Sequence, residues 1–417
     1  MVNIGVIGTG TVGSGVIGIY QKNGERLTAS TGEAIRLKSV CDLDFCRCPY
    51  NLSEFQQTQD QHAILSDPEI QIVVELIGGE HPAGEIIAEA LKSGKHVVTA
   101  NKLVMAKHGK ALLELAAEKK VSLLFEAAVA GAIPIIAALH HSLQPNRIQG
   151  VYGIVNGTTN FILTQMHQRD ADFQEVLREA QRLGYAEADP SSDIEGLDSL
   201  YKLCLLAAVA FQAPIPVENV LVEGISAITA QDLRFVKSRG GVVKLIALAR
   251  HTKGKLELRV HPTILASSHP LAGVNDVFNA VYVQGDCSGD LMFYGPGAGG
   301  IPTASAVWAD ILAIADKTAY RPILSNCCHF LPSEEMESKY YFRFQTDGNR
   351  IGIAEICAVF AAHRIGIQEV LRVGSGEETE LLVNTDKATE KDKNMLLRAV
   401  SVLPGVKKRG SVIRIGL

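Results

Sequence analysis

The feature that most constrains this chain is its beginning. An apolar run, Val2–Ile7, leads directly into Gly8-Thr9-Gly10-Thr11-Val12-Gly13, and an apolar helix pattern follows over Ser14–Tyr20. In a strand–turn–helix unit of this kind, the first glycine permits the tight turn, the second lets the backbone approach a pyrophosphate, and the third allows the helix to pack closely on the strand. The N-terminus of the helix then faces the anion. The beginning of the chain therefore predicts a dinucleotide site formed by Gly8, Thr9, Gly10, Thr11, Val12 and Gly13.

Strand-like and helix-like segments alternate from residue 1 to about residue 130, with strands predicted over Ile35–Cys41 and Lys95–Thr99, among others. This alternation is typical of the α/β class, in which a doubly wound parallel sheet carries helices on both faces. Such sheets bind ligands outside the carboxyl ends of their strands. We therefore expect a Rossmann domain over residues 1–130, and we expect Thr99 and Lys102 to lie near its cofactor.

The choice between the two nicotinamide dinucleotides depends on the residues near the second predicted strand. Asp42 directly follows that strand, where a carboxylate hydrogen-bonds a ribose hydroxyl and disfavours a ribose phosphate, which points to NAD. Lys38 and Arg47 are close enough in sequence to favour NADP instead. The distance from Gly13 to Asp42 also exceeds the usual spacing of roughly 20 residues, so that solvated loop charges are an alternative. The sequence leans slightly to NAD and leaves NADP open.

The chain changes character after the Rossmann pattern. Residues 131–320 predict an α+β domain for substrate binding, catalysis and oligomerisation. Within it, a glycine-rich run that contains Gly299 precedes a helix pattern reaching about Ala315, and such a run brings backbone N–H groups to a helix N-terminus. We expect Gly299 to contact the cofactor.

The end of the chain predicts a small separate module. Residues 321–338 read as a linker, and residues 339–417 alternate in a βαββαβ order typical of a ferredoxin-like unit. A unit of about 80 residues has little core of its own, so a second copy is expected to cover its sheet.

Composition excludes several classes of protein. The net charge of −5, with signs interspersed, gives no basic stripe for nucleic acid. The apolar runs fall short of the roughly 20 residues that cross a bilayer, and the N-terminus lacks the pattern of a secretory signal. The 8 cysteines fit neither a disulfide framework nor zinc spacing. We expect reduced thiols and a cytoplasmic protein without nucleic-acid or membrane partners.

Longer motifs carry a resemblance to a known family. The start GVIGTGTVG, the segment VNGTTNFIL at 155–163 and the segment GYAEADPSSDIEGLDSLYK at 184–202 resemble homoserine dehydrogenase, and the likeness extends over essentially the whole chain. The resemblance implies an oxidoreductase that interconverts L-homoserine and L-aspartate 4-semialdehyde with NAD or NADP, in the pathway to threonine, methionine and isoleucine. Two alternatives are an oxidoreductase acting on another amino-acid semialdehyde, and a non-catalytic nucleotide or amino-acid sensor.

The reaction needs a cation or an acid near the carbonyl oxygen, because negative charge grows there when hydride adds to the carbon. Lys202 lies four residues after Asp198, which on a helix places both side chains on one face. An isolated pair of this kind is usually a surface ion pair. The resemblance implies instead that Lys202 donates the proton and Asp198 binds substrate. It also implies that Lys102 orients the carbonyl beside the cofactor and that Glu187 holds the substrate amino group. A sensor would be expected to lack Lys102 and Lys202.

Two further sets of residues follow from the resemblance. Asn156-Gly157-Thr158-Thr159-Asn160 is turn-like by composition, and the resemblance places Gly157 at the nicotinamide and Thr158 at the substrate. It also implies a monovalent-cation site, with sodium expected, at which Glu126 supplies a carboxylate and Val129, Gly131 and Ile133 supply backbone carbonyls. A buried carboxylate among small residues is the alternative.

The last 80 residues or so resemble an ACT domain, an amino-acid-sensing module. Its first loop, Asp347–Gly352, would receive an effector between paired copies, and feedback by L-threonine is expected from the position of the module after the catalytic portion. A role in assembly alone is the alternative. Truncation after about residue 330 is expected to keep activity and to abolish any threonine response. The assembly is expected to be a homodimer or a homotetramer.

Overall fold

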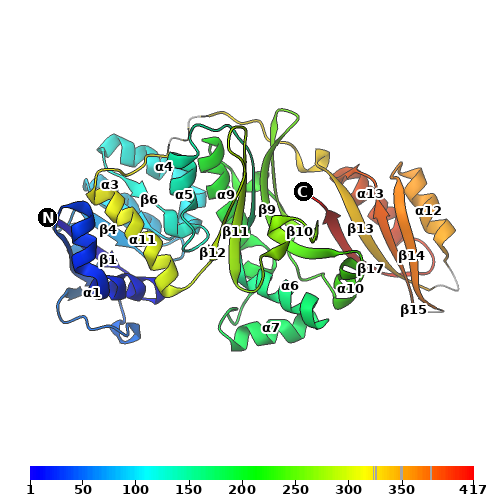
Figure 1. The fold of residues 1–417 in the computed structure, drawn as a ribbon, viewed down its shortest axis with the longest axis horizontal. Coiled ribbons are helices and arrows are strands. Elements are labelled where there is room, and N and C mark those ends of the chain that lie inside the picture. Colours follow the sequence, from blue (N-terminus) through cyan, green and yellow to red (C-terminus); the bar gives the residue numbers. More distant parts are fainter. Residues whose placement is uncertain (323, 325, 348–350, 376–377) are drawn as a thin grey trace. The chain divides into compact units, whose positions relative to one another are not determined.

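The computed structural model describes residues 1–322, 324, 326–347, 351–375 and 378–417. Residues 348–350 of the predicted effector loop therefore lie outside the described residues. The chain forms two compact units, coloured by sequence in Figure 1. Unit 1 comprises Met1–Val155, Tyr201–Val217 and Phe278–Cys328, and unit 2 comprises Asn156–Leu200, Glu218–Val277 and His329–Leu417.

Unit 1 contains a six-stranded parallel sheet with strand order β3-β2-β1-β4-β5-β6. Its strands are β1 (Val2–Ile7), β2 (Ile35–Cys41), β3 (Gln56–Thr58), β4 (Ile72–Glu75), β5 (His96–Thr99) and β6 (Leu123–Leu124). The helices between them are α1 (Thr11–Thr31), α2 (His62–Leu65), α3 (Ala83–Lys92) and α4 (Lys102–Lys119). The predicted doubly wound α/β class is confirmed.

The central strands explain why this sheet is parallel and covered on both faces. The consecutive residues Val6 and Ile7 of β1 and Val73 and Val74 of β4 are all buried. Successive residues of a strand point to opposite faces, and here both faces are apolar, as parallel sheets require. The same pattern made the strands recognisable in the sequence.

Unit 1 is completed by an antiparallel ribbon and a long helix from later in the chain. The ribbon pairs β7 (Ile148–Ile154) with β11 (Phe278–Gly285), and β11 with β12 (Gly289–Pro296). Helix α11 (Gly300–Ala315) packs against α1, which Figure 1 shows in yellow beside blue. The contact is close because Gly15 carries no side chain: a Cβ there would lie 2.4 Å from the Gly300 carbonyl oxygen. The later segment thus becomes part of the nucleotide-binding half.

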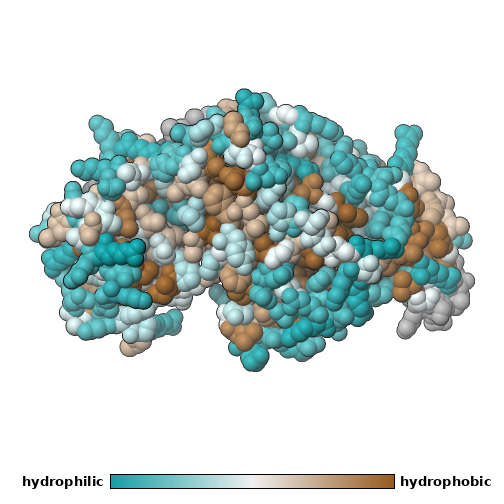
Figure 2. All heavy atoms as spheres, viewed as in Figure 1, coloured by the Kyte–Doolittle hydropathy of each residue, from teal (hydrophilic) through white to brown (hydrophobic). Residues whose placement is uncertain are grey.

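Unit 2 begins with several helices and three paired strands. The helices are α6 (Gly157–Arg169), α7 (Phe173–Arg182), α8 (Ser191–Ile194) and α10 (Ala230–Ser238), and the strands are β8 (Leu221–Val222), β9 (Gly241–Thr252) and β10 (Lys255–Ala266). Two of the helices, α6 and α10, pack against β9. Helix α9 (Leu197–Phe211) starts in unit 2 and ends in unit 1. Helix α7 is strongly two-sided, since Phe173, Val176 and Leu177 are buried while its outer surface is hydrophilic in Figure 2.

The predicted βαββαβ order is present at the end of unit 2. It comprises β13 (Glu337–Thr346), α12 (Ile353–Ala362), β14 (Ile367–Ser375), β15 (Glu378–Thr385), β16 (Ala388–Thr389), α13 (Glu390–Ser401) and β17 (Val406–Ile415). The antiparallel order is β17-β13-β15-β14. Its core gathers Tyr340, Phe342, Phe344 and Phe360. We refer to residues 337–417 as the C-terminal module.

The C-terminal module is built into the sheet of unit 2. Strand β17 pairs in parallel with β10 through Thr263 with Arg414 and through Ile264 with Ile415. Removing the module would uncover β10 and the charged side chains packed on the module. Truncation is therefore a poor test of regulation in this chain. Among the described residues, no helix combines the length and the apolar character needed to cross a membrane.

Candidate cofactor and substrate sites

The three glycines of the first turn have different surroundings. Gly8 has a φ of +100°, and a Cβ on Gly13 would lie 1.9 Å from the Gly8 carbonyl oxygen, so both positions require glycine for the turn itself. A Cβ on Gly10 would meet nothing within 4 Å. Helix α1 starts at Thr11, and its N-terminal N–H groups receive no side-chain cap. Gly10 therefore adjoins open space at a helix N-terminus, which fits a pyrophosphate.

A cavity of about 570 Å³ lies at the carboxyl ends of β1, β2 and β4. Its lining includes Gly8, Gly10, Asp42, Arg47 and Ile77. This is the edge at which a doubly wound sheet presents its ligand.

Asp42 is held at this cavity by the glycine turn. Its Oδ2 atom accepts hydrogen bonds from the Thr9 N–H at 2.5 Å and from the Thr9 hydroxyl at 2.9 Å. Partial burial acts to raise the pKa of Asp42, but the hydrogen bonds from the Asp44 and Thr9 N–H groups hold that pKa below its usual value. The side chain is therefore a carboxylate at neutral pH.

The two cations that argued for NADP occupy different places. Lys38 is engaged elsewhere, because its Nζ atom lies 2.6 Å from Asp67 and 2.8 Å from Glu69 and it does not line the cavity. Arg47 does line the cavity, with its side chain 82% exposed and 3.4 Å from Asp44. Of these two cations, Arg47 alone lines the cavity and could favour NADP there, against the preference for NAD that Asp42 gives.

A second cavity, of about 360 Å³, lies where the N-termini of α1 and α11 meet, and it is lined by residues that include Thr11, Ser14 and Gly300. Gly299 is the N-cap of α11 with a φ of +126°, and no side chain caps this helix. Two helix N-termini thus face one space, an arrangement that favours an anion. The sequence suggested this role for Gly299, although it gave no sign that α11 packs beside α1.

The ends of β4 and β5 are tied together by a residue that sequence reasoning missed. Glu75 is fully buried, and its Oε2 atom accepts the Thr99 hydroxyl at 2.7 Å. Thr99 in turn accepts the Asn101 N–H at 2.9 Å, and the Asn101 side chain caps α4, whose first residue is Lys102. Burial raises the pKa of Glu75. The sequence signal that could have identified Glu75 is an acidic residue at the end of an otherwise apolar strand.

Lys202 and Asp198 both reach the residues that follow β7. The Nζ atom of Lys202 donates to the Val155 carbonyl oxygen at 2.8 Å. One turn earlier on α9, Asp198 is 4% exposed and accepts a hydrogen bond from Asn156 Nδ2 at 2.9 Å. The helix therefore directs its lysine and its carboxylate at two consecutive residues, Val155 and Asn156.

Asn156 joins two acids and starts a helix. Its Nδ2 atom also donates to Asp193 Oδ1 at 2.6 Å, and its Oδ1 atom accepts the Thr159 N–H at 2.8 Å as the N-cap of α6. We call Asn156, Asp193 and Asp198 the Asn156 cluster. Asp193 was not singled out from the sequence, although it lies in one of the long motifs. Only the fold reveals its contact with Asn156.

Gly157 was predicted at the cofactor, and Thr158 and Glu187 were predicted at the substrate. A Cβ on Gly157 would lie 2.8 Å from the Val277 carbonyl oxygen, which leaves no room for a side chain. The buried Thr158 hydroxyl donates to the Tyr185 carbonyl at 2.5 Å. Glu187 lies on an exposed segment after α7.

The predicted cation site contains two buried acids. Glu126 is 1% exposed, and its carboxylate accepts the N–H groups of Ile136 and Ala137 at 2.8 and 2.7 Å. Asp310 is 2% exposed and accepts the Glu126 N–H at 2.9 Å. Burial raises the pKa of both carboxyl groups. Two adjacent buried acids fit a hard cation, which would offset their charge.

The other donors predicted for that site are backbone carbonyls. Gly131 has a φ of +58°, and a Cβ there would lie 2.5 Å from Gly297, so the backbone around Val129, Gly131 and Ile133 is tightly confined. The Ile133 carbonyl already accepts the Ile135 N–H at 2.8 Å. Within the described part of the chain, no three or more His, Cys, Asp or Glu side chains gather as a metal site. The donor set therefore suits an alkali cation better than a transition metal.

The doubly wound sheet, the open glycine turn and a helix that carries a buried carboxylate and, one turn later, a lysine are the features of a nicotinamide-dependent oxidoreductase. Comparison with known proteins specifies it further. The family model "Homoserine dehydrogenase, NAD binding domain" matches residues 8–126, and the model "Homoserine dehydrogenase" matches residues 134–312. The chain belongs to the homoserine dehydrogenase family, whose members act on a CH–OH group.

Individual relatives match over their full length. The chain is 42% identical to a homoserine dehydrogenase of Synechocystis, covering 99% of each chain, and 38% identical to one of Neisseria gonorrhoeae, covering 99% of this chain and 98% of that one. Among solved structures, a homoserine dehydrogenase from Thiobacillus denitrificans matches with a TM-score of 0.94 and 38% identity, covering 100% of this chain and 98% of that one. A hyperthermophilic archaeal homoserine dehydrogenase mutant in complex with NADPH matches with a TM-score of 0.64 and 30% identity, covering 76% of this chain and 98% of that one.

Proposed function

We propose that this chain interconverts L-homoserine and L-aspartate 4-semialdehyde, with Lys202 as the group that handles the proton. The observation that carries the proposal is the direction of Lys202 and Asp198 toward Val155 and Asn156. When bound, the nicotinamide cofactor supplies or accepts the hydride. The Lys202 ammonium stabilises the charge that grows on the carbonyl oxygen and donates its proton there, and it receives the proton in the reverse direction.

The other predicted side chains would bind and orient the substrate. Lys102, at the first turn of α4, orients the carbonyl, and Glu187 pairs with the substrate ammonium group. Asp198 and Thr158 fix the remaining polar atoms. Gly157 keeps the turn beside the nicotinamide free of a side chain, as its closeness to Val277 already requires.

We further propose NAD as the preferred cofactor. The Asp42 carboxylate is fixed by Thr9 at the cavity, and it would accept hydrogen bonds from the adenosine ribose but repel a ribose phosphate. The pairing of Lys38 with Asp67 and Glu69 removes one of the two cations that favoured NADP. Arg47 is exposed and adjoins Asp44.

A sodium ion is proposed at Glu126, with the carbonyls of Val129, Gly131 and Ile133. The support is the buried charge of Glu126 and Asp310. The ion would neutralise these acids and fix the backbone there. Threonine feedback through the C-terminal module and assembly as a homodimer or homotetramer are retained as proposals, supported by the βαββαβ order and by the resemblance to an ACT domain.

One steady-state assay tests these proposals together. L-Homoserine oxidation is measured with NAD and with NADP, with sodium or a bulky organic cation as counter-ion, and with and without L-threonine. We expect oxidation with a higher kcat/KM for NAD, dependence on sodium, and inhibition by threonine. Preference for another amino-acid alcohol would overturn the substrate assignment. A higher kcat/KM for NADP would overturn the cofactor proposal, equal rates with the organic cation would overturn the sodium proposal, and equal rates with and without L-threonine would overturn the feedback proposal.

A further inference from the structure

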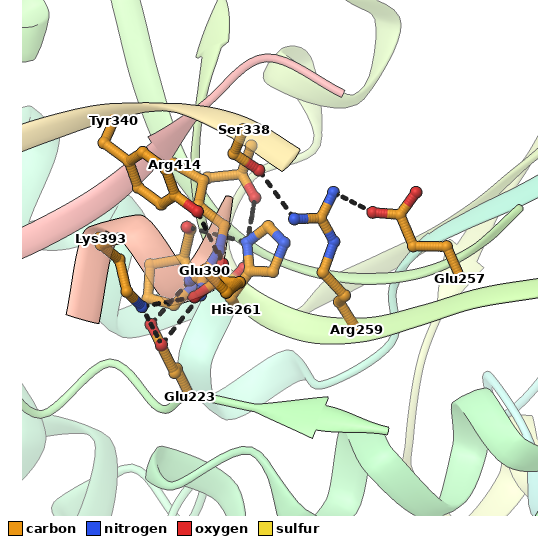
Figure 3. Close-up of polar contacts among 11 residues, drawn as sticks. Glu223, Glu257, Arg259, His261, Ser338, Tyr340, Glu390, Lys393 and Arg414 are labelled. Carbon is orange, nitrogen blue, oxygen red and sulfur yellow. Dashed lines mark hydrogen bonds and ion pairs between the residues drawn. The ribbon is translucent and has the colours of Figure 1, made fainter. Parts of the chain in front are cut away.

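A network of charges joins the C-terminal module to Glu223, the residue after strand β8 (Figure 3), and its members are buried except for Glu223, which is partly exposed. Arg414 of β17 is 1% exposed, and its Nη1 and Nη2 atoms donate to the two carboxylate oxygens of Glu223 at 2.7 and 2.9 Å. Its Nε atom donates to Glu390 at 2.7 Å. Lys393 contacts both acids, at 3.2 Å from Glu223 and 2.6 Å from Glu390.

The position of Glu223 is fixed by charge. Burial acts to raise its pKa, but the hydrogen bonds and the charge of Arg414 hold the pKa of Glu223 far below its usual value. The paired N–H groups of Arg414 match the two oxygens of one carboxylate, a geometry that sets orientation as well as energy. Glu223 is thus held ionised, in one orientation, by two side chains of the C-terminal module.

The segment that contains Glu223 lies directly against the part of the chain that carries the Asn156 cluster. The Ile225 N–H donates to the Ile194 carbonyl at 2.7 Å. A Cβ on Gly224 would lie 2.2 Å from that same carbonyl oxygen, and a Cβ on Gly196 would lie 3.2 Å from Val222. Asp193 and Asp198 flank this contact in sequence and both bind Asn156.

We propose that Glu223 is a positioning residue for the reaction. Through Glu223, the C-terminal module holds residues 191–198, the turn that carries Asp193 and Asp198, in place. Arg414 and Lys393 hold Glu223, and its neighbours Gly224 and Ile225 hold Ile194. Ile194 in turn sets Asp193 and Asp198 against Asn156. The proposal rests on the proposed function, since it assumes that Asp198 binds substrate.

A second buried arginine of the same module provides a matched control. Arg343 of β13 is 5% exposed and donates to Asp232 at 2.8 Å and to Ser411 at 3.1 Å, so it also joins the module to a helix of unit 2. Asp232 lies on α10, whereas the Asn156 cluster lies at the starts of α6 and α9 and in α8. Arg343→Lys thus alters a buried charge of the module while leaving in place the side chains that contact Glu223, Arg414 and Lys393.

The experiment compares Glu223→Gln, Arg414→Lys and Gly224→Ala with Arg343→Lys in the full-length chain. Hydrogen exchange of the amides of residues 191–198 reports the position of the turn directly, and steady-state kinetics report its effect on catalysis. We expect the first three variants to exchange at least about tenfold faster in this segment. We also expect their KM for L-homoserine to rise about tenfold while the KM for NAD changes less than about twofold. Arg343→Lys should change neither quantity by more than about twofold.

Equal exchange in Arg343→Lys and Arg414→Lys would overturn the proposal, because the effect would then be a general loss of stability. Normal exchange and KM in folded Glu223→Gln would overturn it too. Asp198→Asn distinguishes the proposed substrate role of Asp198 from the proposed positioning role of Glu223. If it leaves the KM for L-homoserine unchanged, the substrate role of Asp198 fails, while the exchange data still decide whether Glu223 holds the turn. Gly224→Ala and Arg414→Lys supply the same test should Glu223→Gln fold poorly.

Discussion

The nucleotide turn and the Asn156 cluster achieve their geometry in different ways. The turn is made of consecutive residues, Gly8–Gly13, and it offers backbone N–H groups in a space that side chains must not fill. The Asn156 cluster is made of side chains from three segments, and hydrogen bonds between charged and amide groups hold it together. The first site depends on the absence of side chains from a confined space, and the second depends on the charges of its carboxylates. Substitutions should therefore damage them through different measurable quantities.

The largest effect is expected at Lys202. Replacement of Lys202 by alanine should lower kcat by at least about a hundredfold, the scale of a positioned general acid, because it removes the proposed proton donor. The KM for NAD should change little. Steady-state oxidation of L-homoserine measures both quantities, and Lys237→Ala, an exposed lysine on α10, is the control. Near-normal turnover in Lys202→Ala would remove Lys202 from the mechanism.

Two glycines of the same turn should respond differently. In Gly10→Ala the methyl group meets open space, so the protein should fold normally while the KM for NAD rises about tenfold, equivalent to about 1.4 kcal/mol. In Gly13→Ala the methyl group meets the Gly8 carbonyl, so the free energy of unfolding should fall by about 1–3 kcal/mol. Thermal unfolding and NAD titration of both variants test the distinction. Equal losses of stability would contradict it.

A smaller effect is expected at Asp42. Asp42→Asn keeps the size of the side chain and removes its charge, so the ratio of kcat/KM for NAD to that for NADP should fall about tenfold. This corresponds to the loss of one hydrogen bond to a charged group, about 1.5 kcal/mol. Arg47→Ala, tested in parallel, should raise the same ratio or leave it unchanged. A ratio unaffected by Asp42→Asn would show that other residues select the cofactor.

The last effect concerns stability rather than catalysis, and it depends on pH through a buried lysine, Lys244. The Lys244 Nζ atom donates to Asn160 Oδ1 at 3.0 Å and to the Val274 carbonyl at 2.5 Å, and burial lowers the pKa of Lys244 to about 8. An unfolded lysine has a pKa of about 10.4, so between these values the unfolded chain binds more protons and stability rises with pH.

Lys244→Met should remove that rise. Urea unfolding at pH 7, 8, 9 and 10 should show the free energy of unfolding of the parent protein increasing relative to the variant by about 2 kcal/mol. The exposed Lys237→Met is the control and should follow the parent protein. A parallel pH dependence of the parent and Lys244→Met would exclude Lys244 as the titrating group.

Much of the fold could be predicted because its signals are local. The apolar strands Val2–Ile7 and Ile35–Cys41 were predicted with the bounds that the structure gives them. The strand predicted over Lys95–Thr99 begins one residue later in the structure, at His96. Local patterns identify elements better than they place their ends.

The sites were predictable to a lesser degree. Lys202, Asp198 and the glycine turn lie in motifs that can be recognised directly in the sequence. Three other residues could not be recognised in this way, because their importance arises from contacts with residues distant in the chain. These are Asp193 with Asn156, Glu75 with Thr99 and Glu223 with Arg414. A charged residue in an apolar segment is only a weak signal of such a contact.

The sequence by itself determined the alternating strands and helices, the glycine turn and the types of residue available for chemistry, because backbone sterics and the periodicity of burial act over a few residues. The tertiary structure alone decided that Lys38 pairs away from the cofactor cavity, that α11 joins the N-terminus of α1, and that Arg414 holds Glu223. Hydrogen bonds and charges act over a few ångströms of space, and only the folded chain brings residues so far apart in sequence within that range.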